Sequence, residues 1–379
     1  MLITRLNGSR KSPHSCMVCG EELTGIGDSV RVCPRCIRLR WEESERWIKA
    51  VHASSREMFK LPLEPPRNPD GLSCNLCFHQ CRMGSEEPGY CAVRRGTRNS
   101  LREDGRKRAR VSYYYDPLPT NCVADWVCAG GTGSGYPNYA NDQGPEVGFY
   151  NLAVFFEACN FNCLYCQNWH FKKKASAEPA WVSIDSLVEA VTDQTSCICY
   201  FGGDPVPQVP YALRVSEEVR RRRPGAIHRI CWETNGSVHP SWLKGMARMS
   251  LDSGGCIKMD LKAWNPYIHR ALCGFDNLRV HENFRHLAEK WAPLRKNPPL
   301  LVASTLLVPG YVDEEEVFQI ASFIAGLDPD IPYALLGFAP QFCLEDFPTT
   351  SLDQADACLA AAKRAGLTRI RVGNRHLLS

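Results

Sequence analysis

The sequence predicts an α/β fold, a partial (β/α)6 barrel over residues 149–379 that follows cysteine-rich metal-binding modules. Two observations predict the barrel. Short apolar runs alternate with helical patterns through this region, which specifies βαβ units and a parallel sheet, and about six such units curl toward a partial barrel. A third observation, 20 cysteines in 379 residues, predicts the modules, because thiols of a protein without an export signal stay reduced and are available to metals.

The expected elements of the barrel follow from this alternation. We expect strands at residues 152–156, 198–201, 229–233, 256–260, 301–308, 334–338 and 369–372. We expect helices between them at residues 184–192, 211–222, 240–249, 277–291, 314–326 and 352–366. In a parallel α/β sheet the functional site lies beyond the carboxyl ends of the strands, so residues directly after each strand are the candidates for chemistry.

Residues 1–60 are predicted to form a zinc-ribbon-like module followed by a helix. Two CxxC pairs, Cys16 with Cys19 and Cys33 with Cys36, are separated by thirteen residues and place four thiolates around one tetrahedral ion. So short a segment cannot fold on an apolar core alone, so a structural zinc ion would stabilise it. Free thiols are the alternative.

Residues 61–110 are predicted to form a proline-rich linker and a second metal module. Its ligands would be Cys74, Cys77, Cys81 and Cys91. Zinc and an auxiliary iron–sulfur cluster both accept four thiolates, and the spacing leaves the choice between them open. Eight basic residues between positions 94 and 110 form either a solvated surface or a contact for an acidic partner or RNA.

Residues 111–148 are rich in glycine and aromatic residues. Their turn chemistry predicts a long loop without regular elements, packed over the active site. The loop contains Cys122 and Cys128, to which the sequence assigns no role.

Directly after the first barrel strand, Cys159, Cys163 and Cys166 form a CxxxCxxC motif. Three close thiolates hold three irons of a [4Fe-4S] cube and leave the fourth iron open to a cofactor or substrate. The alternative is a zinc knuckle completed by His170, but the position at a strand end favours the cluster.

The segment AVFFEACNFNCLYCQNWHF resembles the signature of radical S-adenosylmethionine (SAM) enzymes, including the aromatic Tyr165 before the last cysteine. The resemblance implies a barrel of the radical SAM type. It also implies that the open iron binds SAM and that the reduced cluster cleaves SAM to a 5′-deoxyadenosyl radical, which abstracts hydrogen from a substrate.

Further segments at later strand ends resemble motifs of the pyruvate formate-lyase activating enzymes. The resemblance implies that SAM or a neighbouring cation contacts Gly202, Gly203, Asp204, Glu233, Asn235, Asp260 and Lys262. Asp204 departs from the glutamate of the family motif and has a shorter reach, so the backbone there is expected to contribute more than the side chain. VPGYVD at residues 308–313 resembles a turn of the same group.

CNLCFHQC, GYCAVRR, CQNWHF, GFAPQF and RVGN together resemble radical SAM proteins of the AmmeMemoRadiSam type over roughly residues 70–379. The two resemblances imply an enzyme that acts on a protein or peptide, by activation or post-translational modification such as methylation, with flavodoxin or ferredoxin as electron donor. An RNA-modifying radical SAM enzyme and a non-catalytic zinc-binding adaptor are the alternatives. No DxHxxG motif indicates cobalamin, although base-off binding is not excluded.

No apolar stretch is long enough to span a bilayer, and the first residues lack the apolar run of a secretory signal. We therefore expect a cytoplasmic protein with no membrane partner.

Overall fold

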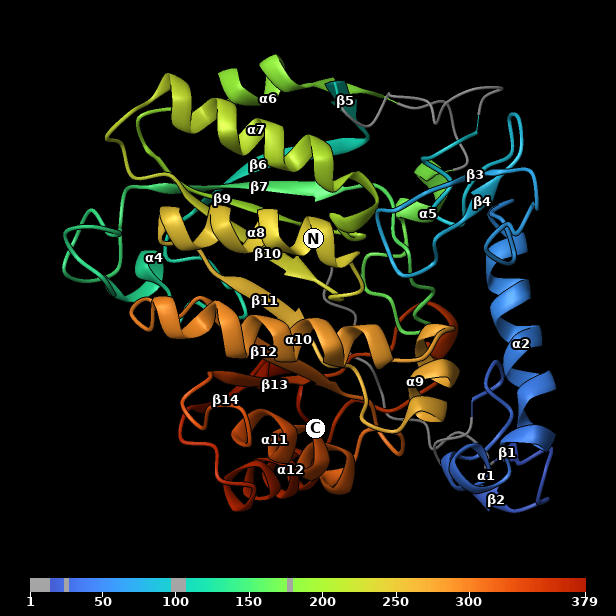
Figure 1. Cartoon of the computed structure of the whole chain (residues 1–379). Coiled ribbons are helices and arrows are strands. Elements are labelled where there is room, and N and C mark those ends of the chain that lie inside the picture. Colours follow the sequence, from blue (N-terminus) through green and yellow to red (C-terminus); the bar gives the residue numbers. More distant parts are fainter. Residues whose placement is uncertain (1–13, 24–26, 97–106, 176–179) are drawn as a thin grey trace, which may run out of the picture.

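The structure of the chain, a computed structural model, describes residues 14–23, 27–96, 107–175 and 180–379 (Figure 1). Its centre is an eight-stranded sheet in the order β14-β13-β12-β11-β10-β9-β7-β6, in which every pair is parallel except β6 with β7. The parallel strands are β7 (Tyr150–Phe156), β9 (Thr195–Gly202), β10 (Arg229–Thr234), β11 (Ile257–Asp260), β12 (Leu301–Leu307), β13 (Tyr333–Gly337) and β14 (Ile370–Gly373). All seven predicted strands are therefore confirmed.

Helices follow most strands and cover the outer face of the curved sheet (Figure 1). They are α6 (Ile184–Glu189), α7 (Val209–Arg222), α8 (Pro240–Ser253), α9 (Pro266–Cys273), α10 (Leu278–Lys290), α11 (Glu314–Ala325) and α12 (Leu352–Arg364), with short 3-10 turns at Val206–Gln208, Ala292–Leu294, Phe342–Leu344 and Arg375–Leu377. Helix α9 was not predicted. Asn265 begins it by accepting hydrogen bonds from the backbone N–H groups of Tyr267 and Ile268.

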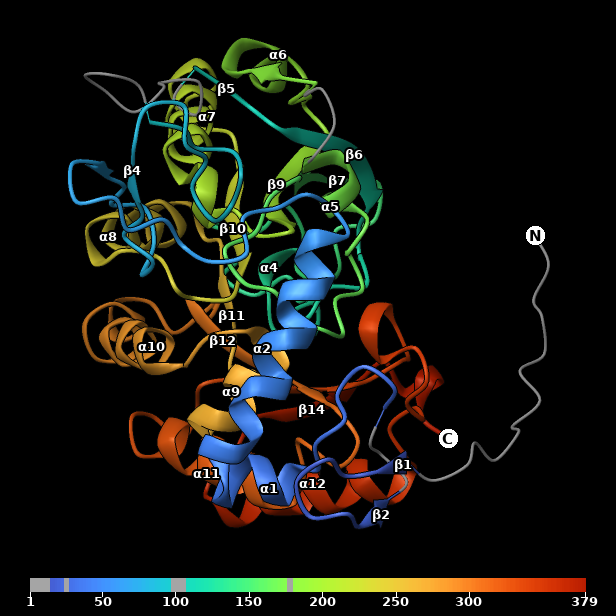
Figure 2. The same ribbon diagram turned by 90° about the vertical axis from the view of Figure 1, so that its right-hand side faces the viewer.

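The N-terminal module lies beside the carboxyl ends of the strands. It contains β1 (His14–Ser15), β2 (Glu22–Leu23), α1 (Pro34–Leu39) and α2 (Trp41–Glu57), and α2 runs along this edge of the molecule (Figures 1 and 2). The module docks on the turn that carries the VPGYVD segment. There the Tyr311 hydroxyl donates to the Val32 carbonyl at 3.1 Å and Arg38 donates to the Tyr311 carbonyl at 3.0 Å.

The second module contains β3 (Leu72–Ser73) and β4 (Arg82–Met83) and packs against the loop between β10 and α8. The backbone N–H of Phe78 donates to the Ser237 carbonyl at 3.0 Å, and that of His239 donates to the Leu76 carbonyl at 2.9 Å. In the basic stretch that follows, Arg98, Arg102 and Arg106 lie outside the described residues. Arg94 and Arg110 are buried, which contradicts a wholly solvated basic surface.

Residues 111–148 differ from the predicted loop in two ways. Val111–Pro117 forms β6, a full strand that pairs antiparallel with β7, and Ala129–Thr132 forms the short helix α4. The turn residues begin only after β6, so they do not prevent a strand there. The rest of the segment reaches the amino ends of the strands, where the Arg229 guanidinium donates to the Tyr139 carbonyl at 2.8 Å. The segment therefore closes the end of the barrel opposite to the one that it was expected to cover.

Three short elements complete the architecture: β5 (Arg108–Ala109) pairs with β8 (Val182–Ser183), and α5 (Phe171–Ala175) follows the CxxxCxxC segment. No described helix has the length and apolar character needed to cross a membrane.

Candidate functional site

The predicted site residues meet in one cleft at the carboxyl ends of β7, β9, β10 and β11. The cleft has a volume of about 1080 Å³, solvent at its mouth included. Its lining includes all eleven predicted residues: Cys159, Cys163, Tyr165, Cys166, Gly202, Gly203, Asp204, Glu233, Asn235, Asp260 and Lys262. Residues from four separate strand ends thus face the space beside the three cysteines, and their individual roles stay predictions.

The loop that carries the three cysteines is held from outside by the end of α9. The backbone N–H groups of Asn162 and Leu164 donate to the carbonyls of Cys273 and Leu272 at 3.0 and 2.9 Å. The loop makes few hydrogen bonds within itself, so these contacts from another element fix its path. All three thiols remain partly exposed to the cleft.

Two buried asparagines inside the motif connect this loop to the N-terminal modules. His79 of the second module hydrogen-bonds the Asn160 carbonyl at 2.7 Å. The side chain of Asn162 donates to His52 Nδ1 at 2.9 Å and to the Ser55 hydroxyl at 2.8 Å, both on α2. Asn160 and Asn162 have no exposed surface, so their polar groups require these partners. Both modules therefore support the geometry of the cysteine loop.

Gly202 and Gly203 allow the end of β9 to approach the cysteine loop. The N–H groups of Gly203 and Asp204 each donate at 2.8 Å, to the carbonyls of Phe156 and Ala158. A Cβ on Gly203 would lie 2.3 Å from the Ala158 carbonyl oxygen, and Gly202 has a φ of +110°. Only glycine fits both positions without moving the loop.

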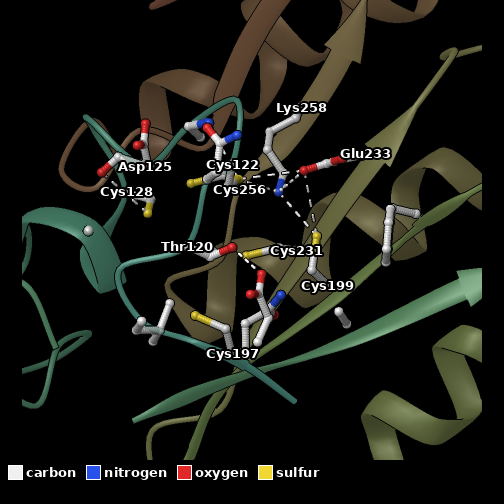
Figure 3. Close-up of a pocket in the computed structure, with 18 of the residues that line it drawn as sticks. Thr120, Cys122, Asp125, Cys128, Cys197, Cys199, Cys231, Glu233, Cys256 and Lys258 are labelled. Atoms are coloured by element: carbon white, nitrogen blue, oxygen red, sulfur yellow. Dashed lines mark hydrogen bonds and ion pairs between the residues drawn. The ribbon is translucent and has the colours of Figure 1, made fainter. Parts of the chain in front are cut away.

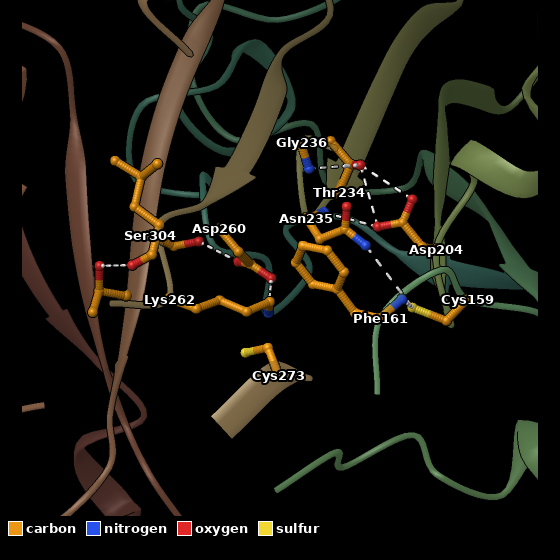
Figure 4. A network of polar contacts seen from close by, with 12 residues as sticks. Cys159, Phe161, Asp204, Thr234, Asn235, Gly236, Asp260, Lys262, Cys273 and Ser304 are labelled. Atoms are coloured by element: carbon orange, nitrogen blue, oxygen red, sulfur yellow. Dashed lines mark hydrogen bonds and ion pairs between the residues drawn. The ribbon is translucent and has the colours of Figure 1, made fainter. Parts of the chain in front are cut away.

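The Asp204 carboxylate points to β10 and away from the open cleft. It accepts hydrogen bonds from the backbone N–H groups of Asn235 at 2.7 Å and Val206 at 2.9 Å, and from the Thr234 hydroxyl at 3.2 Å (Figure 4). Burial raises the pKa of Asp204 to about 7. The side chain thus ties two strand ends together, in line with the expectation that the backbone contributes more to ligand contact.

On the opposite wall, Lys262 donates to the Asp260 carboxylate at 2.8 Å, and the Ser304 hydroxyl donates to the same carboxylate at 2.6 Å (Figure 4). Burial alone would lower the pKa of Lys262, but the nearby charges of Asp260 and Cys163 raise it well above its usual value. Lys262 therefore stays cationic in the cleft. A buried ammonium beside the cysteines suits an anionic group on a bound cofactor.

The three thiols differ in acidity. A hydrogen bond with Cys273 lowers the pKa of Cys163 to about 7, whereas burial raises the pKa of Cys166 to about 11 and that of Cys159 well above its usual value. Thiolates are the form that binds iron, so binding at this loop would release protons.

A profile described as the Radical SAM superfamily matches residues 153–324, a range that contains every one of the eleven predicted residues. Residues 153–324 form a radical SAM domain. The cleft lies at the carboxyl ends of its strands, and the three cysteines follow its first strand.

Among curated proteins, the radical SAM domain is similar to two activating enzymes. The isethionate sulfite-lyase activating enzyme of Desulfovibrio desulfuricans is 35% identical over 139 residues, 36% of this chain and 40% of the relative. The pyruvate formate-lyase 1-activating enzyme of Escherichia coli is 26% identical over 179 residues, 46% of this chain and 66% of the relative. The chain therefore spans less than two-thirds of the length of each.

Among solved structures, a domain of pyruvate-formate lyase-activating enzyme from Bacteroides vulgatus is similar with a TM-score of 0.36 and 18% identity. The match covers 46% of this chain and 98% of that domain.

The zinc-ribbon candidate outside the radical SAM domain has the geometry of a single-ion site. The thiols of Cys16, Cys19, Cys33 and Cys36 all lie within 4.8 Å of one another. Four sulfurs at about 2.3 Å from a tetrahedral zinc ion lie about 3.8 Å apart, and Cys19 Sγ is 3.9 Å from Cys33 Sγ. These donors fit a metal ion, and its identity as zinc stays a prediction.

The second cysteine set is also brought together. Cys74, Cys77, Cys81 and Cys91 line one small, largely apolar cavity with Tyr90, next to Asn160 of the cysteine loop. Burial raises the pKa of Cys91 to about 12 and that of Cys77 well above its usual value, so both are neutral without a metal. The four donors fit a thiolate-bound metal or cluster, and the choice between zinc and iron stays open.

Several residues of the site were missed. Cys273, Ser304, Lys172 and Lys258 contact predicted residues or line the cleft, yet the sequence assigned them no role. Lys172 and Lys258 each had a signal, since one follows CQNWHF and the other begins the KMDLK segment. Cys273 had none, because it ends a helix that was not predicted.

Proposed function

We propose that this chain is a radical SAM enzyme that cleaves SAM reductively and abstracts hydrogen from a protein or peptide substrate. A [4Fe-4S] cluster with SAM bound supplies the electron that breaks the sulfonium bond and yields a 5′-deoxyadenosyl radical. The observation that carries the proposal is the convergence of four strand ends on three cysteines in one cleft.

In this proposal, Cys159, Cys163 and Cys166 hold the cluster, and the rest of the cleft orients SAM. Lys262, kept cationic by Asp260, would neutralise the SAM carboxylate. The backbone at residues 202–204 would receive the methionine amino group. Tyr165 and Phe161 contribute aromatic surface that would exclude water from the reacting atoms.

The class of substrate rests on the names of the relatives. Both relatives are named as activating enzymes of a lyase, so their printed substrates are proteins. We infer a protein or peptide substrate for this chain too, modified on a side chain or backbone carbon. Flavodoxin or ferredoxin, small soluble proteins, would supply the electron.

The test uses the full chain purified without oxygen. With SAM and a strong reductant, we expect the protein to release 5′-deoxyadenosine and methionine. A variant with Cys159→Ala, Cys163→Ala and Cys166→Ala should lose this activity completely. Cys358→Ala is the matched control, since Cys358 is fully buried on α12 and no site residue contacts it in the described structure.

Persistent 5′-deoxyadenosine formation in the triple variant would overturn the proposal. The substrate class is tested separately: a small metabolite that saturably accelerates 5′-deoxyadenosine formation without any protein or peptide present contradicts it, whereas transfer of deuterium between a peptide and 5′-deoxyadenosine supports it.

A further inference from the structure

A second cavity lies inside the barrel, adjoining the cleft, and six cysteines line it. It has a volume of about 710 Å³ with its open mouth included and shares Phe201, Glu233 and Lys258 with the cleft. The cysteines are Cys122, Cys128, Cys197, Cys199, Cys231 and Cys256 (Figure 3). We call this cavity the thiol chamber. None of its cysteines belongs to the CxxxCxxC motif or to either N-terminal module.

The strand period explains how these side chains meet. Alternate residues of a strand face the same side, so Cys197 and Cys199 of β9 both point into the barrel. Cys199 pairs with Cys231 in the register of β9 and β10. The register of β10 and β11 pairs Trp232 with Ile257 and so places Cys256 beside Cys231. Three neighbouring strands therefore present a row of thiols, and Cys122 and Cys128 face it from the segment that closes the barrel.

These thiols are not packed like ordinary core cysteines. Cys273 and Cys358 have 0% exposed surface, whereas Cys197, Cys199 and Cys231 keep 7%, 6% and 9%, and this surface faces the chamber. A small hydrophobe that fills a core would leave no such space.

The thiols also face buried cationic donors. Lys258 Nζ lies 3.0 Å from Cys122 Sγ and 3.1 Å from Cys199 Sγ. Arg229 Nε donates to Cys197 Sγ at 3.2 Å. Charged N–H groups aimed at sulfur are what thiolate ligands of a metal centre receive from their surroundings, and they offset the negative charge of such a centre.

We propose that the thiol chamber binds an iron–sulfur cluster of its own, separate from the cluster at Cys159, Cys163 and Cys166. A single ion fits less well. Among the described residues, Cys16, Cys19, Cys33 and Cys36 form the one group of His, Cys, Asp and Glu donors that all lie within 4.8 Å. The chamber thiols surround a cavity at wider spacing, which suits a centre of several metal atoms.

The chamber cluster would face the same space as SAM. Glu233 and Lys258 form the boundary, since both line the chamber and the cleft and pair at 2.8 Å. Burial raises the pKa of Cys122 and Cys128 to about 12, so these thiols are neutral until a metal displaces their protons.

The experiment compares iron and acid-labile sulfide in full chains reconstituted without oxygen. The reference is the variant with Cys159→Ala, Cys163→Ala and Cys166→Ala, which removes the motif cluster whatever its function. A second variant adds Cys199→Ala, Cys231→Ala and Cys256→Ala. The matched control instead adds Cys358→Ala to the reference. Since the second N-terminal module is unchanged in all three, the difference isolates the chamber.

We expect the chamber variant to lose about two to four irons per chain relative to the reference, with an equal loss of sulfide. The control should lose none. Equal iron and sulfide in the reference and the chamber variant would overturn the proposal, and so would a loss of zinc or copper without sulfide. If the chamber variant does not fold, judged by circular dichroism, Cys231→Ala alone in the reference gives the same comparison. Because the reference cannot cleave SAM under the proposed function, failure here is distinct from failure of that function.

Discussion

A buried ion pair holds the segment that closes the barrel, and its removal tests this part of the architecture. Arg229, at the start of β10, donates to the Glu146 carboxylate at 2.8 Å, and both side chains are buried. Glu146 also accepts hydrogen bonds from the Asn141 N–H at 2.7 Å and the Ser196 hydroxyl at 2.6 Å. Glu146→Gln keeps the volume and most of these contacts but removes the charge.

The expected cost follows from the burial of both partners. Breaking a buried pair leaves one uncompensated charge in the interior, which destabilises a protein by about 3–5 kcal/mol. Because the amide still accepts hydrogen bonds, we expect the lower end, about 3 kcal/mol. With a urea dependence of about 3 kcal/mol per M, the unfolding midpoint should fall by about 1 M.

The assay is urea unfolding followed by tryptophan fluorescence, with Glu289→Gln as the matched control. Glu289 pairs with Arg285 at 4.0 Å on the surface of α10, where its side chain is 48% exposed, so its loss should cost about 0.5 kcal/mol or less. We also expect faster proteolysis within residues 118–148 of the Glu146→Gln protein only. Equal midpoints for the two variants would refute the view that this pair anchors the segment.

Three further predictions concern the same pair, the cleft and the zinc-ribbon candidate. Although burial alone would raise it, Arg229 holds the pKa of Glu146 below its usual 4.5, so the pair's stabilisation is complete above that pH and is lost as pH falls; acid titration of stability should be steeper for wild type than for Glu146→Gln. Gly203→Ala should slow 5′-deoxyadenosine formation about tenfold to a hundredfold, because its Cβ displaces the cysteine loop, whereas Gly144→Ala, with no atom within 4 Å, should not. Cys36→Ala should release zinc from the purified protein, measured by elemental analysis, and Cys358→Ala should retain it.

The sequence contained enough information for the main architecture of the barrel. Apolar runs bounded by turn residues located every parallel strand, and caps such as Asp313 and Ser351 marked helix starts close to those observed. Parallel strands are buried on both faces and read as short continuous apolar runs, so their signal is strong. Strand-end motifs then located one edge of the sheet, because all carboxyl ends of parallel strands meet there.

Two elements carried a weaker signal. β6 is an edge strand whose tyrosines at 113–115 are exposed, so it shows no apolar run. α9 spans only Pro266–Cys273 and depends on its Asn265 cap and on contacts with the cysteine loop. Tertiary packing determines both, and a local pattern does not report it. The same reason explains why His52 and His79 were not connected with the cluster motif, although each contacts an asparagine within it.

The thiol chamber did leave a pattern in the sequence. On three neighbouring strands a cysteine stands two residues before a cysteine, a glutamate or a lysine, at Cys197, Cys231 and Cys256. Read one strand at a time, each cysteine is a small apolar residue in a buried strand, and that interpretation is reasonable. Read together, the period of two places all six side chains on the inner face of one sheet, in two adjacent rows. A row of thiols below a row with Glu233 and Lys258 is a chemical pattern that no single strand contains, and it becomes visible once the strand order is known.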